Sequence, residues 1–151
     1  MTSSADASPL LIRARLVHPS ARLPLKATAS ASGYDLYACL PGGPIDLGQV
    51  PALVPTGLAI AVPDGFDAQV RPRSGLARQG VMVAFGTIDA DYRGELLVTM
   101  YTTAPGIRHT VHDGDRIAQL VISRLADVRF VESGPLDVTA RGAGGHGSTG
   151  R

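Results

Sequence analysis

The chain has 151 residues, a length that suits one domain with one hydrophobic core. Its formal net charge of +1 argues against a broad nucleic-acid-binding surface, and no apolar run approaches the roughly 20 residues of a membrane-spanning helix. The 18 glycines and 11 prolines, spread along the whole chain, leave little room for long helices and favour many short strands joined by turns. We therefore expect an all-β protein that binds neither nucleic acid nor membranes.

The first residues carry no targeting signal that we recognise. "MTSSADASP" (1–9) lacks the basic and apolar regions of a signal peptide and predicts a disordered N-terminal extension. Cys39 is the one cysteine, so an intrachain disulfide is excluded. A cytoplasmic location is the expectation that follows.

The first strands are expected from alternating and apolar runs. Residues 10–17 alternate, with Ile12, Ala14 and Leu16 on one side, which predicts a half-buried strand. Further strands are expected in the two segments 33–38 and 53–62, the second of them interrupted by a proline and a glycine.

The second half of the chain continues this pattern. Residues 66–73 alternate cleanly, and 81–85 and 95–103 are strand candidates. Residues 116–132 fit a helical period, although their β-branched Val121 and Ile122 favour a strand, so periodicity leaves this segment open. Together these elements predict a β-sandwich or barrel, whose exposed edges must be covered or paired, for example by oligomerisation.

"RPRSGLA" (71–77) is a candidate anion-binding segment. Arg73, Ser74 and the amides around Gly75 could hold an anion together, because guanidinium groups and turn amides both donate hydrogen bonds to it. A polar strand end followed by a turn explains the same residues without a ligand.

"GTIDADYRGEL" (86–96) is a candidate catalytic segment. Asp89 and Asp91 point the same way if the chain is extended, and apolar Ile88 predicts partial burial of Asp89. A partly buried carboxylate could act as a general base for water. The alternative is a hairpin with solvated charges. Farther on, Gln119 stands inside an apolar run and needs hydrogen-bond partners, either backbone groups or a ligand.

The glycine-rich end "RGAGGHGSTGR" (141–151) nearly matches the phosphate-loop pattern GxxxxGK[ST]. Ser148 stands where that pattern has lysine, and no room for a helix follows Thr149, so a P-loop is excluded. The glycine amides, the two hydroxyl groups and the charge of Arg141 still suit phosphate. A flexible tail is the alternative.

Five segments, "ASGYDLYA", "RPRSGLA", "GTIDADYRGEL", "GDRIAQL" and "RGAGGHGSTG", occur in this order. In order and spacing they resemble the five motifs of the homotrimeric dUTPase family, over nearly the whole chain from about Leu10. The resemblance implies a distorted jelly-roll β-barrel and a homotrimer with shared active sites. It implies hydrolysis of dUTP to dUMP and pyrophosphate with Mg²⁺, and a strand at 116–125. We expect a β domain over 10–140 and a flexible flap over 141–151 that completes the active site.

The resemblance also assigns roles to residues. Asp89 would activate the attacking water, and Tyr92 would pack under the deoxyribose, where a 2′-OH would not fit. Asp35 and Gln119 would act on the metal indirectly, through water. Gln119 would also bind the substrate, near its phosphates. The other expected substrate-binding residues are Arg73, Ser74, Gly75, Arg141, His146, Gly147, Ser148 and Thr149.

The chain departs from the family pattern at two places. His146 stands where the family usually has a phenylalanine over the uracil, so we expect a weaker aromatic lid and pH-dependent binding. The segment before Asp89 is about two residues shorter than usual and contains Phe85.

Two alternative functions remain open at this point. The first is a dCTP deaminase or bifunctional deaminase of the same fold, with which the presence of Glu95 is compatible. The second is a non-catalytic nucleotide-binding regulator.

Overall fold

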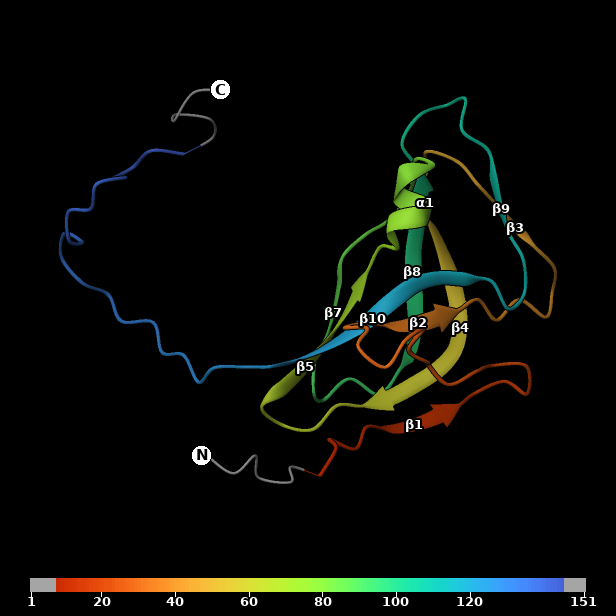
Figure 1. Ribbon diagram of the computed structural model, residues 1–151, viewed down its shortest axis with the longest axis horizontal. Coiled ribbons are helices and arrows are strands. Elements are labelled where there is room, and N and C mark those ends of the chain that lie inside the picture. Colours follow the sequence, from red (N-terminus) through yellow and green to blue (C-terminus); the bar gives the residue numbers. More distant parts are fainter. Residues whose placement is uncertain (1–7, 146–151) are drawn as a thin grey trace.

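The structure is a computed structural model, and it describes residues 8–145. Its regular elements in that range are ten β-strands and one short helix, arranged in three antiparallel sheets (Figure 1). The all-β prediction is therefore confirmed. No helix in the described residues is long and apolar enough to cross a membrane.

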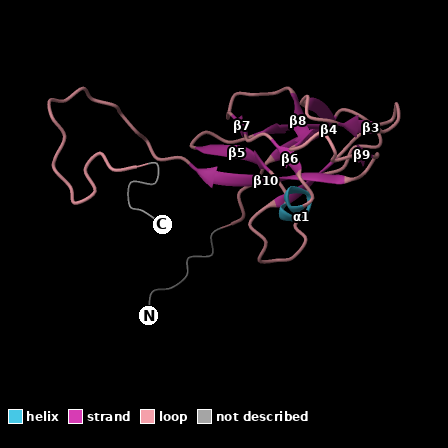
Figure 2. Cartoon of the chain, turned by 90° about the horizontal axis from the view of Figure 1, so that it is seen from above, coloured by secondary structure: helices cyan, strands magenta, loops and turns pink. Residues whose placement is uncertain are grey.

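The two four-stranded sheets face each other, and a two-stranded ribbon closes one end (Figures 1 and 2). The first sheet has the order β1 (Arg13–Leu16), β4 (Ala52–Ala61), β8 (Glu95–Thr102) and β6 (Val81–Val83). The second has the order β2 (Tyr34–Tyr37), β10 (Arg116–Arg124), β5 (Phe66–Arg71) and β7 (Gly86–Ile88). The ribbon pairs β3 (Ile45–Leu47) with β9 (His109–Val111).

The core between the sheets is aliphatic. Leu36 of β2, Val54 of β4, Met100 of β8 and Ile117 of β10 are each at most 1% exposed. Burying a side chain of this size contributes about 1.5–3 kcal/mol, so the inward half of each alternating strand stabilises the fold. In β5 Ala68 and Val70 are buried, as the alternation of 66–73 predicts, but Asp67 on the opposite, polar side is buried as well, at 6% exposed.

β4 contains a β-bulge at its proline and glycine. The register with β8 shifts between Pro55 and Ala59, and Gly57 has a φ of 64°. A Cβ atom at Gly57 would lie 2.6 Å from the Cβ of Ala21 and 2.9 Å from the sulfur of Cys39. Only glycine therefore fits, and the strand continues instead of breaking.

The structure decides three expectations about local secondary structure and burial. β10 settles the ambiguous segment as a strand that ends at Arg124. The turn expected after Pro72 contains a five-residue helix, α1 (Ser74–Arg78). The prediction that β1 is half-buried is wrong for this chain by itself: all four of its residues are exposed, and Ala14 on its apolar side lines an open cavity of about 450 Å³.

The C-terminal segment leaves the sheets after Leu125, whose amide donates to the carbonyl of Gly65 at 2.9 Å. Residues 126–145, here called the arm, contain no strand or helix and extend away from the body (Figures 1 and 2). The arm exposes apolar side chains, among them Phe130 at 97%.

Candidate active site

The first part of the site is an ion-paired cluster around Asp35. Arg73 Nε lies 3.1 Å from Asp35 Oδ1, and Arg116 Nη1 lies 3.4 Å from Asp35 Oδ2. Arg73 also donates from Nη1 to the carbonyl of Arg116 at 3.1 Å. The Asp35 side chain is only 12% exposed, so the two guanidinium groups neutralise a nearly buried charge. The pairing leaves Arg73 in a defined position with donors to spare for an anion.

The local backbone explains why Arg73 reaches Asp35. Pro72 keeps the chain extended, and Arg73 itself has φ −93° and ψ 133°, directly before α1. The next residues, Ser74 and Gly75, are exposed at the start of the helix. The second motif therefore places a guanidinium group, an exposed hydroxyl group and the first amides of a short helix next to one another in the chain.

Gln119 joins this cluster from β10. It is paired with Asp35 on one side and with Arg71 on the other, so the three side chains share the outer face of the second sheet. Gln119 Nε2 donates to the carbonyl of Pro72 at 2.9 Å, which ties β10 to the loop that carries Arg73. Residues Asp35, Arg73 and Gln119, expected from separate segments, are thus brought together.

Gly33 makes the position of Gln119 possible. A Cβ atom at Gly33 would overlap the Oε1 atom of Gln119 and lie 3.1 Å from its Cβ and Cδ atoms. Neither Gly33 nor Arg116 was singled out from the sequence. Both stand inside quoted motif segments, beside Asp35 and Gln119, and that proximity is the one signal that could have identified them.

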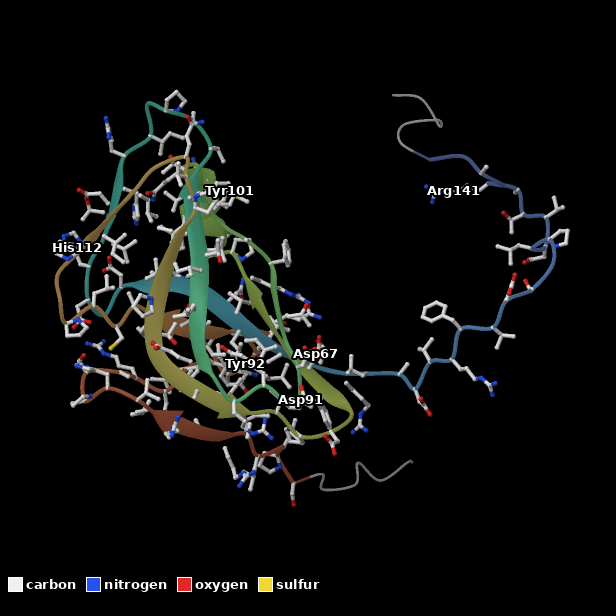
Figure 3. The ribbon with its side chains drawn as sticks, turned by 180° about the vertical axis from the view of Figure 1, so that it is seen from behind. Asp67, Asp91, Tyr92, Tyr101, His112 and Arg141 are labelled. Atoms are coloured by element: carbon white, nitrogen blue, oxygen red, sulfur yellow. The ribbon has the colours of Figure 1, made fainter. Side chains whose placement is uncertain are left out.

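The second part of the site is a cavity of about 220 Å³ between β7 and β8. Asp89 and Tyr92 line it together with Glu95, and its apolar walls include Ile88 and Leu96. The Tyr92 hydroxyl donates to the carbonyl of Glu95 at 2.9 Å. Figure 3 shows Tyr92 and Asp91 at the same end of the barrel, in the turn between the two strands.

Two expectations about Asp89 were wrong for the single chain. Asp89 is exposed rather than partly buried. The chain is not extended through Asp89 and Asp91 but turns, because the amide of Tyr92 donates to the carbonyl of Asp89 at 3.1 Å. Ile88, the apolar residue before Asp89, is buried as the last residue of β7. Its burial does not extend to the carboxylate of Asp89.

The two parts lie far apart in one chain. Ala68 pairs with Ile88, so Asp89 follows the last pair next to Asp67, whereas Arg73 lies six residues farther along the chain, two residues past the end of β5. At about 3.3 Å per residue this separation is about 20 Å. Arg141, the first residue of the expected flap, lies on the arm away from both parts (Figure 3). Its Nε atom donates to the carbonyl of Gly144 at 2.8 Å.

His146, Gly147, Ser148 and Thr149 lie outside the described residues, as do residues 1–7 of the expected N-terminal extension. Within residues 8–145 no group of three histidine, cysteine, aspartate or glutamate side chains could hold a metal ion directly.

The chain is similar to known proteins over most of its length. The sequence profile of the family described as dUTPase matches residues 20–150. The deoxyuridine 5'-triphosphate nucleotidohydrolase of Treponema pallidum subsp. pallidum is 51% identical over 150 residues, which cover 93% of this chain and 99% of that protein. The protein of the same name from Wolinella succinogenes is 46% identical over 144 residues, covering 93% of this chain and 94% of that protein.

Solved structures agree with the fold. The dUTPase of Staphylococcus bacteriophage 80alpha with dUPNHPP has a TM-score of 0.77 at 24% identity, and covers 93% of this chain and 99% of that one. A mutant dUTPase from phage phi11 of S. aureus, described with a structural Mg(II) ion, has a TM-score of 0.76 at 21% identity, over 85% of this chain and 100% of that one. The expected dUTPase-like β-barrel is thereby confirmed, and the chain belongs to the dUTPase family.

Proposed function

We propose that the protein hydrolyses dUTP to dUMP and pyrophosphate, which limits uracil incorporation into DNA and supplies dUMP for dTMP synthesis. The observation that carries this proposal is the 51% identity, over 93% of the chain, to a deoxyuridine 5'-triphosphate nucleotidohydrolase. The geometry supports it, because Asp89 and Tyr92 line one cavity between β7 and β8. The base and sugar would occupy this cavity.

Asp89 is the proposed catalytic residue. Its carboxylate accepts a proton from a water molecule while the water oxygen forms a bond to the α-phosphorus. The bond between the α-phosphorus and the bridging oxygen breaks, and pyrophosphate leaves with the electron pair. Asp89 is exposed in the single chain and free to receive water. Tyr92 would pack against the deoxyribose and exclude a 2′-OH.

The cluster around Asp35 is the proposed phosphate site. Arg73 is held in place by Asp35 and retains free donors, and Gln119 is fixed beside it. Such preorganised donors stabilise the charge that develops on the leaving group. The proposed phosphate and base contacts beyond these are Ser74, Gly75, Arg141, His146, Gly147, Ser148 and Thr149.

The family fold implies Mg²⁺, and the donor set is compatible with it. Both oxygens of Asp35 already contact arginines, so a direct bond from Asp35 to a metal is disfavoured. Magnesium usually keeps several waters and binds through substrate phosphates. Asp35 and Gln119 would therefore orient metal-bound waters, and the ion, when bound, neutralises phosphate charge.

A homotrimer with shared sites is the second part of the proposal. Water on Asp89 must come within about 3–3.5 Å of the phosphorus, so Asp89 and the phosphate site must flank the same triphosphate. In one chain they are about 20 Å apart along β5 and the two residues that follow it. Asp89 of one copy facing Arg73 of another removes this conflict.

The buried carboxylate of Asp67 also supports contact between copies. Asp67 is 6% exposed, and its Oδ2 atom accepts from Gln69 at 2.8 Å. Its Oδ1 atom has no hydrogen-bond partner within residues 8–145. Because buried polar atoms are almost always paired, a donor from a neighbouring copy would complete this one.

The arm would join the copies. A cavity of about 450 Å³ beside β1 is lined largely by apolar side chains, including Ile12, Ala14 and Phe66. The arm exposes Phe130 at 97% and leaves its own barrel. We assign the cavity to the arm of a neighbouring copy, which would also cover β1 and explain its alternating pattern. On this proposal residues 1–9 form an extension, 10–140 the β domain with residues 126–140 of the arm, and 141–151 the flap that closes the site.

The alternatives have less support. The carboxylate of Glu95 accepts a hydrogen bond from the amide of Gly57 at 2.7 Å, so it is engaged in structure and poorly suited to deaminate a base. A regulator without turnover would not need Asp89 at the cavity. A cytoplasmic location is part of the proposal, because the substrate belongs to the free nucleotide pool.

A substrate panel tests the activity. Pyrophosphate release and ammonia release should be measured for dUTP, dCTP, dTTP and UTP with Mg²⁺. We expect pyrophosphate from dUTP in large excess over the others and no ammonia. Ammonia from dCTP would establish the deaminase, and binding without either product would establish the regulator.

A further inference from the structure

The ring of Tyr92 rests directly on the backbone of Gly94. A Cβ atom built at Gly94 would overlap the phenol oxygen of Tyr92 and lie 2.6 Å from Cζ and 3.0 Å from Cε2. The same hydroxyl donates to the carbonyl of Glu95 at 2.9 Å. The ring is therefore held by one hydrogen bond and by a space that only glycine leaves.

Glu95 is itself anchored to the neighbouring strand. Its Oε1 atom accepts from the amide of Gly57 at 2.7 Å, inside the bulge of β4. One residue away, the hydroxyl of Thr56 donates to the carbonyl of Leu96 at 2.7 Å, and Thr56 is buried. Two hydrogen bonds thus fasten the first residues of β8 to the bulge, and through Glu95 they fix the acceptor of the Tyr92 hydroxyl.

We infer that Gly94 and Glu95 are positioning residues that set the choice between deoxyribose and ribose by holding Tyr92 in one place. The inference rests on the proposed function, in which Tyr92 contacts the sugar. The Tyr92 ring excludes the 2′-hydroxyl group of ribose only if the ring does not move, because a displaced ring would leave room for the larger sugar. Gly94 supplies the space, and Glu95 supplies the fixed hydrogen-bond acceptor.

The test compares kcat/KM for dUTP and for UTP in the wild-type protein and in Gly94→Ala. We expect the ratio of the two values to fall at least about tenfold in Gly94→Ala. Gly48→Ala is the matched control, because a Cβ atom there meets nothing within 4 Å, and its ratio should equal that of the wild type. Thermal unfolding and size-exclusion chromatography of each variant verify the fold.

A double-mutant cycle separates action through Tyr92 from a general disturbance. In a Tyr92→Ala background, Gly94→Ala should leave the dUTP/UTP ratio unchanged, because the group that it displaces is gone. A further fall in that background would overturn the inference. If Gly94→Ala does not fold, Tyr92→Phe removes only the donor to Glu95, and it should also lower the ratio.

The outcomes distinguish this inference from the proposed function. A wild-type protein that releases no pyrophosphate from dUTP contradicts the proposed function. A wild-type protein that prefers dUTP, together with a folded Gly94→Ala or Tyr92→Phe that keeps the full ratio, contradicts the inference alone.

Discussion

Arg73 and Asp35 form an ion pair of 3.1 Å that joins the loop before α1 to β2 across 38 residues of sequence. Asp35 also contacts Arg116 at 3.4 Å, so one nearly buried carboxylate positions two arginines. The ion pair with Asp35 fixes the position of the Arg73 guanidinium group, which we propose binds phosphate.

Asp35→Ala should therefore reduce activity more than it reduces stability. Hydrogen bonds to charged groups contribute about 1.5–3 kcal/mol, so we expect kcat/KM for dUTP to fall about 10- to 150-fold. Asp46→Ala is the control, because it removes one exposed hydrogen bond from Thr110 in the β3–β9 ribbon, a sheet that carries none of the proposed site residues. Equal loss of activity in both variants would show that Asp35 has no special role.

Gly33→Ala should displace the carboxamide of Gln119 and break its bond to Pro72. Overpacking of this kind costs about 1–3 kcal/mol, and we expect a lower Tm together with lower activity. Adding Gln119→Ala relieves the overlap and should restore Tm but not activity. A Gly33→Ala protein with wild-type Tm and kcat would show that the space beside Gln119 is not needed.

Deletion of residues 141–151 should leave a folded oligomer with little activity, since it removes Arg141 and the remaining flap residues but keeps residues 126–140 of the arm. Deletion of residues 126–151 should in addition weaken the oligomer, because it removes the apolar side chains assigned to the cavity beside β1. Size-exclusion chromatography reports the oligomeric state of the two truncated proteins, and pyrophosphate release from dUTP reports their activity. Full activity after the shorter deletion contradicts the flap.

His146→Phe should lower KM for dUTP and flatten its dependence on pH. An imidazole gains a proton near neutral pH, whereas a phenyl ring does not, so only the wild-type KM should change between about pH 5.5 and 8. KM measured across that range checks this. Identical profiles would remove His146 from base binding.

Much of the barrel was predictable from alternation. Residues 66–73 alternate, and β5 buries Ala68 and Val70 as that pattern predicts, with buried Asp67 as the exception. Residues 116–132 were ambiguous because a helical period and β-branched residues coexist there, and pairing with β2 and β5 decides for a strand. Tertiary contacts of this kind are not encoded in local periodicity.

Two predictions fail at positions that the proposed oligomer would cover. β1 alternates as a half-buried strand should, yet Ala14 faces an open cavity in the single chain. Asp89 follows a buried Ile88 but is itself exposed. Gly33 and Gly94 were missed because steric roles of glycine depend on neighbours that only the folded structure brings into contact.

If dUTP is hydrolysed at a site built from two copies of the chain, two inactive variants should restore activity when they are mixed. Arg73→Ala and Asp89→Asn should each release almost no pyrophosphate from dUTP. After joint unfolding and refolding of equal amounts, about one quarter of the sites in a random trimer would combine an intact Asp89 from one copy with an intact Arg73 from another. We therefore predict recovery of about one quarter of the wild-type rate. A mixture that remains as inactive as its components, although mixed oligomers have formed, would contradict the shared site.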